Sequence, residues 1–187
     1  MVVSQIALSQ EGLTCSRFAL GVWRMAEWGM SSTEILDFIE TCLELGITTF
    51  DHADIYGDYT CEQLFGDALA KQPSLRNQMQ LVTKCGIKLV SKNRPAHTIK
   101  HYDTRAVHIL ASVENSLKQL RTDYIDLLLI HRPDPLMDAD EVATAFSQLR
   151  QSGKVLHFGV SNFMPRQFNL LASRLDFPLV TNQIEIS

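Results

Sequence analysis

Four side chains capable of proton transfer or ion pairing lie at or just after the ends of apolar, strand-like segments: Asp51, Tyr56, Lys84 and His131. A carboxylate beside a lysine keeps the amine charged. A lysine ammonium beside a tyrosine favours the phenolate and lowers the pKa of the phenol. Gathered at one place, residues of these types could deliver a proton to a reacting oxygen. Because an unpaired buried charge costs several kcal/mol, their repeated position at strand ends indicates one shared active site.

Polar residues with short amide or hydroxyl side chains close two later segments. Ser161 and Asn162 follow one, and Gln183 ends another. Each such residue also has an ordinary structural explanation, since Asp51 could cap a turn, Lys84 could be solvated and Ser161 could cap a helix. Their joint occurrence at successive strand ends is what favours a site, and barrel enzymes of alternating strands and helices keep their chemistry there.

The elements that must position these residues alternate along the chain. Apolar residues recur at helical spacing between the strand-like segments, as at Ile35, Ile39 and Cys42. Repeated strand–helix units predict parallel strands joined by right-handed crossovers. The predicted strands cover residues 18–23, 47–51, 80–84, 125–131, 155–161 and a sixth beginning at Leu179.

Two architectures have this alternation, an open doubly wound sheet and a closed (β/α)8 barrel. The first strand–helix turn, residues 21–25, contains no GxGxxG, which argues against a dinucleotide-binding sheet. Strand parity favours the barrel. Lys84 shares a face with Val82, and His131 shares one with Ile125, Leu127 and Leu129, so these side chains are expected to point inward.

The chain is too short to form a complete barrel. A complete (β/α)8 barrel takes about 250 residues, whereas this chain has 187. We therefore expect residues 1–187 to form one barrel domain truncated at the C-terminus. It would hold an N-terminal hairpin turning at residues 10–12, about five strand–helix units and a sixth strand.

Composition excludes several classes of function. The net charge is −4, so no basic face is expected for nucleic acid or an anionic membrane, and no segment has the roughly 18 apolar residues of a membrane span. The four cysteines form no CxxC pair, which indicates reduced thiols and a cytoplasmic protein. The histidines have no metal-ligand spacing, so we expect no metal. No feature specifies an oligomeric state.

The motifs taken together resemble those of the aldo-keto reductase family, in particular its bacterial oxidoreductase-like branch. They occur in the family's order and cover essentially the whole chain. Each one alone is weak, but the set is highly specific. The motifs are Asp51-His-Ala-Asp-Ile-Tyr56-Gly57, Thr83-Lys84-Cys-Gly86, Leu127-Leu-Leu-Ile-His131-Arg-Pro133, Gly159-Val-Ser161-Asn162-Phe163 and Thr181-Asn182-Gln183.

The resemblance implies an NAD(P)H-dependent oxidoreductase that reduces an aldehyde or ketone to an alcohol by hydride transfer. It makes Tyr56 the proton donor, Lys84 its activator and Asp51 the partner of Lys84. His131 would hydrogen-bond the substrate carbonyl, and Trp23 would help to line the substrate pocket.

The resemblance also implies a nicotinamide site. Ser161, Asn162 and Gln183 match positions that hold the carboxamide, with Asp51 beside them, and an amide with two donors and one acceptor suits such side chains. NADPH is the expected cofactor, with NADH possible. The family's groups for stacking on nicotinamide and gripping the adenosine phosphate come after the sixth strand. We therefore expect the truncated chain alone to be inactive or nearly so.

Two other functions remain open from the sequence. One is a regulatory or nucleotide-sensing module on the same fold with vestigial catalysis, although binding alone would not need Asp51, Tyr56, Lys84 and His131 together. The other is a nicotinamide-independent barrel enzyme that uses Lys84 as a Schiff-base amine. Such a lysine is usually desolvated, and Asp51 is its predicted partner instead.

Overall fold

The computed structural model describes residues 2–8, 10 and 12–186. The strands are β1 (Gln5–Ala7), β2 (Thr14–Ser16), β3 (Leu20–Gly21), β4 (Thr49–Asp51), β5 (Gln80–Cys85), β6 (Ile87–Lys88), β7 (His101–Tyr102), β8 (Ile125–Ile130), β9 (Val155–Ser161) and β10 (Leu179–Gln183). The α-helices are α1 (Ser32–Glu44), α2 (Tyr56–Tyr59), α3 (Cys61–Leu69), α4 (Ala106–Leu120), α5 (Ala139–Gln151) and α6 (Pro165–Ala172). Two short 3-10 helices are η1 (Met25–Glu27) and η2 (Pro73–Gln78).

One six-stranded parallel sheet organises the molecule, in the order β10-β9-β8-β5-β4-β3. The sheet is curled. The end of β10 reaches the end of β4 although three strands separate them in this order, and the Gln183 Nε2 donates to Asp51 Oδ2 at 3.3 Å. Strand–helix alternation and parallel pairing are thus confirmed, and the curled sheet is that of an incomplete (β/α)8 barrel.

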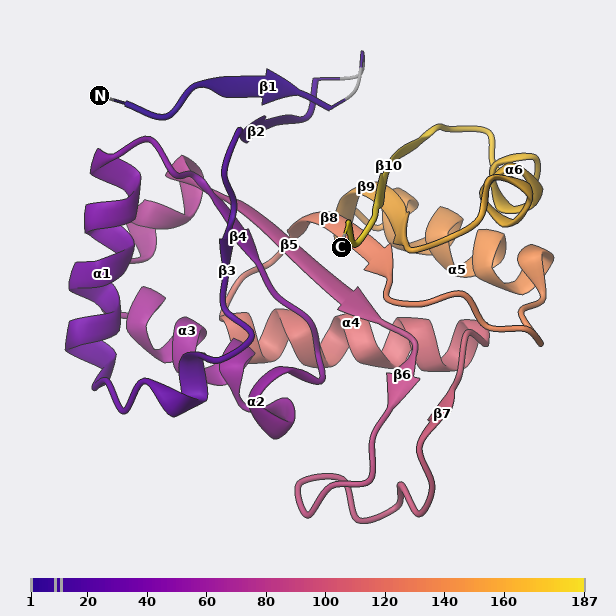
Figure 1. Ribbon diagram of the computed structural model, residues 1–187, viewed down its shortest axis with the longest axis horizontal. Coiled ribbons are helices and arrows are strands. Elements are labelled where there is room, and N and C mark those ends of the chain that lie inside the picture. The colour runs from indigo at the N-terminus through magenta and orange to yellow at the C-terminus, as the bar shows by residue number, and fades with distance from the viewer. Residues whose placement is uncertain (1, 9, 11, 187) are drawn as a thin grey trace.

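The helices cover the outside of the curled sheet (Figure 1). The hairpin β1–β2 lies at the end where the strands begin, and the pair β6–β7 projects at the opposite end, where the site residues are expected. Helix α1 illustrates how sequence sets a boundary. Ser31 and Glu34 form a capping box at its start, and Ile35, Ile39 and Cys42 bury one face.

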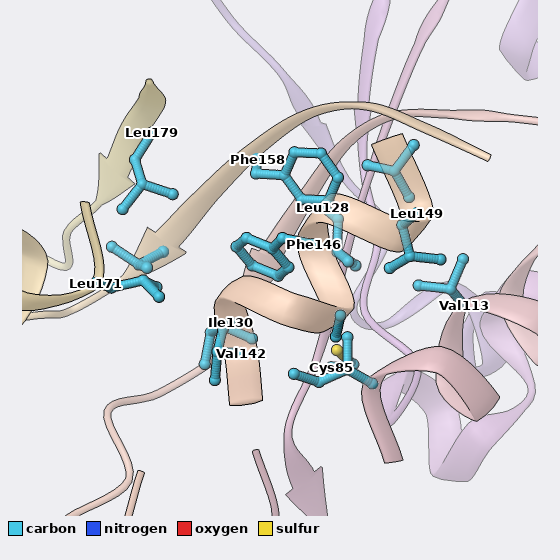
Figure 2. Packing of buried hydrophobic residues seen from close by; sticks show 14 of the residues in the cluster. Cys85, Val113, Leu128, Ile130, Val142, Phe146, Leu149, Phe158, Leu171 and Leu179 are labelled. Carbon is cyan, nitrogen blue, oxygen red and sulfur yellow. The ribbon is translucent and has the colours of Figure 1, made fainter. Parts of the chain in front are cut away.

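The outer core joins helices α4, α5 and α6 to strands β8, β9 and β10. Figure 2 shows Phe146 of α5 against Phe158 of β9, with their ring centroids 4.5 Å apart. Leu128 and Ile130 of β8 point into the same cluster. Fully burying side chains of this size stabilises the fold by about 1.5–3 kcal/mol each, so this layer holds the strands that carry the later site residues.

The inner face follows the predicted parity with one exception. Val82, Leu127 and Leu129 pack together, and Leu13 and Cys15 of the N-terminal hairpin region cover them. The prediction for Ile125 was wrong. This first residue of β8 belongs to the outer cluster, where it pairs with Val155 at the start of β9.

Two predicted strand boundaries also differ from the structure. The first barrel strand was expected over residues 18–23, but β3 contains only Leu20 and Gly21. The flanking aromatics Phe18 and Trp23 are about two-thirds exposed (65% and 66%), so they lie outside the sheet. The N-terminal hairpin is confirmed by antiparallel pairing of β1 with β2. Glu11 of its predicted turn lies outside the described residues.

Among the described residues, no helix has the length and apolar character needed to cross a membrane.

Helices α3 and α4 meet unusually closely. A Cβ built at Gly66 of α3 would lie 2.0 Å from the carbonyl oxygen of Gln119 in α4. Beside this contact, the buried Glu62 carboxylate accepts from Thr83 Oγ1 at 2.6 Å and from Ser116 Oγ at 2.9 Å. The glycine therefore sets the distance at which α3, α4 and β5 share this hydrogen-bonded carboxyl group.

We predict that Gly66→Ala lowers the free energy of unfolding by about 1–3 kcal/mol, the usual cost of overpacking a core. The better helix propensity of alanine, worth about 1 kcal/mol, opposes this effect without removing the backbone clash. Urea unfolding of the two chains measures the difference. The control is Gly21→Ala, where a Cβ meets nothing within 4 Å. Equal stability of wild type and Gly66→Ala would contradict the proposed close contact.

Candidate active site at the carboxyl ends of the strands

Lys84 is the centre of the site. It ends the inner face of β5, is 2% exposed, and its ammonium reaches three acceptors. The Lys84 Nζ lies 2.7 Å from Asp51 Oδ1, 2.9 Å from the carbonyl oxygen of His52 and 3.3 Å from Tyr56 Oη. An ammonium has three donors, so each of its protons has an acceptor. The structure therefore brings three of the four predicted catalytic residues into contact.

Burial dominates the electrostatics around Tyr56. It raises the pKa of Tyr56 to about 12, and the nearby Asp51 carboxylate acts in the same direction, whereas the charge of Arg132 acts to lower it. The activation of Tyr56 by Lys84 stays a prediction. Burial also lowers the pKa of Lys84, whereas the charge of Asp51 and its hydrogen bond act to raise it.

His131 follows β8 and faces the phenol. The rings of Tyr56 and His131 lie edge to face, with centroids 5.8 Å apart. Burial and the nearby charges of Lys84 and Arg132 lower the pKa of His131 to about 3, so its imidazole is neutral near pH 7. The His131 Nδ1 is buried and has no hydrogen-bond partner among the described residues.

The amide-bearing residues meet at the neighbouring strand ends. Ser161 Oγ donates to the carbonyl oxygen of Gln183 at 3.1 Å, and Asn162 Nδ2 donates to Ser161 Oγ at 3.2 Å. Asn162 has a left-handed backbone, with φ of 56°, and its Oδ1 accepts from the amide of Glu185 at 2.8 Å. The exposed side chain of Gln183 also contacts Asp51. The residues predicted to hold the carboxamide are thus in contact with the lysine cluster through Gln183 and Asp51.

These side chains fit a nicotinamide in donor and acceptor type. The amide of Gln183 and the hydroxyl and amide of Ser161 and Asn162 can each pair with a carboxamide. Among the described residues, no group of three or more His, Cys, Asp or Glu side chains is arranged to hold a metal ion.

A cleft of about 540 Å³ opens over Tyr56 and His131. Trp23 lines it and is mostly exposed, whereas its role as a substrate-side residue stays a prediction. Met25 and Trp28, which follow the same strand, do not line the cleft: Met25 is buried in the core, and Trp28 packs edge to face on Phe38.

Several cleft residues were not predicted from the sequence. Arg132 and Glu185 lie on one wall and approach each other to 3.4 Å. Lys100 and Tyr102 come from the segment between β5 and α4, which we call the arm (residues 87–102). The position of Arg132 directly after His131 is a local signal in the sequence that it lies near the site. Lys100, Tyr102 and Glu185 reach the cleft only through the tertiary structure.

Comparison with known proteins agrees with this geometry. Residues 17–187 match the model of the aldo/keto reductase family. The chain is 62% identical over 177 residues to an oxidoreductase, YcsN, of Bacillus subtilis (strain 168), covering 95% of this chain and 59% of the relative. It is 50% identical over 186 residues to a 6-dehydroglucose reductase of Agrobacterium fabrum, covering 99% of this chain and 62% of that protein.

Comparison with solved structures gives the same result. The structure of a glycerol dehydrogenase from Gluconobacter oxydans superposes with a TM-score of 0.81 at 34% identity, over 96% of this chain and 54% of that chain. This chain therefore spans less than two thirds of the length of the relatives it matches. The family model spans residues 17–187, and the relatives are 50% and 62% identical over nearly the whole chain, so the chain belongs to the aldo/keto reductase family.

Proposed function

We propose that this protein reduces an aldehyde or ketone to an alcohol with NAD(P)H, with Tyr56 as the proton donor. The observation that carries the proposal is the contact of Lys84 Nζ with both Asp51 and Tyr56 Oη beneath the cleft. Binding of a ligand alone would not require a buried ammonium against a tyrosine hydroxyl. When bound, the nicotinamide supplies the hydride.

The proton path uses only groups in this cluster. The protonated phenol of Tyr56 donates a hydrogen bond to the carbonyl oxygen, on which negative charge develops. As that oxygen takes the proton, the Lys84 ammonium stabilises the phenolate that remains. Asp51 keeps Lys84 charged despite its burial. A phenol with a pKa of about 12 is fully protonated near neutral pH, which is the state that a donor requires.

His131 and the amide-bearing residues have positioning roles in the proposal. A neutral imidazole can donate one hydrogen bond to the substrate oxygen without adding a charge. Ser161, Asn162 and Gln183 would hold the carboxamide so that the reactive ring faces the cleft. NADPH is the cofactor that the family favours, with NADH as the second possibility.

The geometry disfavours the Schiff-base alternative. Although burial lowers the pKa of Lys84, as expected for an amine nucleophile, its three acceptors occupy every donor of the ammonium. Lys84 does not line the cleft, where a carbonyl substrate would have to reach its nitrogen.

The polar cleft wall favours a hydroxylated substrate. Lys100, Arg132 and Glu185 surround the space above Tyr56, and they could pair with hydroxyl groups beside the carbonyl. The relatives named as a 6-dehydroglucose reductase and a glycerol dehydrogenase support the same substrate class.

We expect the 187-residue chain by itself to have little turnover, because β3 and β10 lie at the edges of its curled sheet and no described strand joins them. Site variants are therefore best assayed both in this chain and in a chimera. The chimera continues this chain with the part of YcsN that lies beyond the matched region.

In the active background, Tyr56→Phe should lower kcat for NADPH-dependent aldehyde reduction by roughly 10²–10⁴-fold, the usual contribution of a positioned general acid. NADPH binding should remain, because the phenol is not needed to hold the carboxamide. Tyr124→Phe is the matched control, since this ring stacks on Arg76 away from the cleft. Binding of NADPH without reduction of any aldehyde in the wild-type chimera would favour the regulatory module instead.

The proposal predicts different pH responses for the two directions of the reaction. Tyr56 stays protonated below its pKa of about 12, and His131 stays neutral above its pKa of about 3. The kcat for reduction should therefore be flat near neutral pH. Alcohol oxidation needs the phenolate as base, so its rate should rise about tenfold per pH unit. Rate profiles in both directions measure this. A decrease in reduction around pH 7 that His131→Gln abolishes would contradict the assignment of a neutral imidazole.

Substrate preference can be tested with a matched pair of aldehydes. We expect kcat/KM for glyceraldehyde to exceed that for propanal by at least about tenfold, since unpaired polar groups reject an analogue that lacks the hydroxyls. Arg132→Leu should reduce this ratio and leave the propanal value nearly unchanged. Equal kcat/KM values for the two aldehydes in the wild type would rule out recognition of hydroxyl groups.

A further inference from the structure

A second cavity, of about 220 Å³, lies between the arm and helix α4. It is distinct from the active-site cleft, and Ile87 contributes to the walls of both spaces. None of the proposed catalytic residues lines it. Its polar and aromatic walls come from Asp54, Tyr59, Arg94, His97, His108, Ser112 and Asn115.

Asp54 is a buried polar group in this cavity, as is Ser112, which hydrogen-bonds the Asp54 side chain. Asp54 is 8% exposed, and its Oδ1 has no hydrogen-bond partner among the described residues. Its backbone amide donates to the carbonyl oxygen of Lys84 at 3.0 Å, so its place in the fold is fixed. Burial and the neighbouring Glu62 raise the pKa of the Asp54 carboxyl well above its usual range. A buried oxygen without a partner costs free energy, so this group is suited to receive a ligand.

Two imidazoles form part of the wall. His97 Nδ1 lies 3.2 Å from the carbonyl oxygen of Leu89 and 3.4 Å from the hydroxyl of Tyr59. A neutral imidazole has one donor and one acceptor, whichever nitrogen carries the proton. The Nε2 of His108 is buried and has no partner among the described residues. Burial lowers the pKa of both rings, that of His108 to about 4, so both are neutral at pH 7.

The remaining wall is held rigidly in place. The guanidinium of Arg94 lies over the ring of Tyr59, 4.6 Å from its centroid, and the Tyr59 hydroxyl accepts from the amide of Leu89 at 2.8 Å. Asp58 and Tyr59 both have left-handed backbones, with φ of 56° and 67°. Such conformations cost about 1–3 kcal/mol for residues other than glycine and persist only where their surroundings enforce them.

We propose that this cavity binds a small neutral polyhydroxylated compound, such as a polyol or a sugar. A hydroxyl group both donates and accepts. It can therefore pair with the Asp54 carboxyl and with the imidazoles of His97 and His108 whichever of their atoms carry protons, and it can accept from Arg94. The side-chain amide of Asn115 offers a donor and an acceptor in addition.

Other ligand classes match the wall less well. An inorganic anion would bring a charge beside the buried Asp54 carboxyl, with Arg94 as the one Lys or Arg side chain among the described lining residues to offset it. No metal-holding group of three or more His, Cys, Asp or Glu side chains occurs in the part of the chain that the structure describes. An apolar ligand would leave all these polar atoms unpaired. The proposed site does not depend on turnover in the cleft.

The test is a titration of the purified chain, labelled with ¹⁵N-histidine, with glycerol and with D-glucitol. The ring-nitrogen resonances of His97 and His108 should shift with saturation in the millimolar range, and inorganic phosphate should produce no matching shift. Ala111→Phe places a ring into the cavity from the exposed face of α4 and should abolish the shifts. Asn115→Leu should weaken binding about 3- to 10-fold, as expected for a lost hydrogen bond. Lys118→Phe, on the same helix and outside the cavity, is the matched control.

Three outcomes would overturn the proposal. The first is the absence of any polyol-dependent shift at His97 and His108. The second is unchanged polyol binding in both Ala111→Phe and Asn115→Leu, which would place the ligand elsewhere, for example in the active-site cleft. The third is saturable binding of phosphate in preference to the polyols. Because the readout is spectroscopic, it is independent of whether the protein reduces a carbonyl compound.

Discussion

The structure of the site depends on the burial of one positive charge, the ammonium of Lys84. A buried charge is tolerated only when hydrogen-bonded partners surround it, and removing one partner of such a pair costs about 3–5 kcal/mol. Asp51, the carbonyl of His52 and Tyr56 provide those partners. They can do so because β4 pairs with β5 in a register that sets Asp51 opposite Val82, two residues before Lys84. The register of β4 on β5, the salt bridge between Asp51 and Lys84, and the position of the Tyr56 hydroxyl therefore depend on one another.

Residues 51–59, from the end of β4 to the end of α2, contribute side chains both to the lysine cluster and to the second cavity. Asp51 and Tyr56 belong to the lysine cluster, whereas Asp54 and Tyr59 line the second cavity. The left-handed residues that end at Tyr59 turn the chain between the two. The arm lies between the same two spaces, and Ile87 touches both. A ligand in the second cavity would therefore contact the segment that forms a wall of the cleft, without touching the proton donor.

Sheet curvature connects the earliest and latest site residues. Asp51 and Gln183 are 132 positions apart in the sequence and lie on strands with three others between them, yet their side chains meet at 3.3 Å. The helices cover the outside of the curved sheet, and Leu13 and Cys15 of the N-terminal hairpin region pack on Val82, Leu127 and Leu129 of its inner face. The groups proposed to hold the nicotinamide can contact the groups around Lys84 only because the sheet bends this far.

The sequence by itself determined the strand–helix alternation, the inward parity of Val82, Lys84, Leu127 and Leu129, and the set of residues at the strand ends. These follow from local periodicity and from the cost of burying charge, which one stretch of sequence already contains. Only the tertiary structure decided the outward position of Ile125, the role of the His52 carbonyl as an acceptor, and the contributions of Lys100, Tyr102 and Glu185 to the cleft. It also decided that the pKa of Tyr56 rises, because desolvation depends on every atom packed around the phenol and not on its neighbours in the sequence. The second cavity is of the same kind, since its walls come from three segments that meet only in the folded chain.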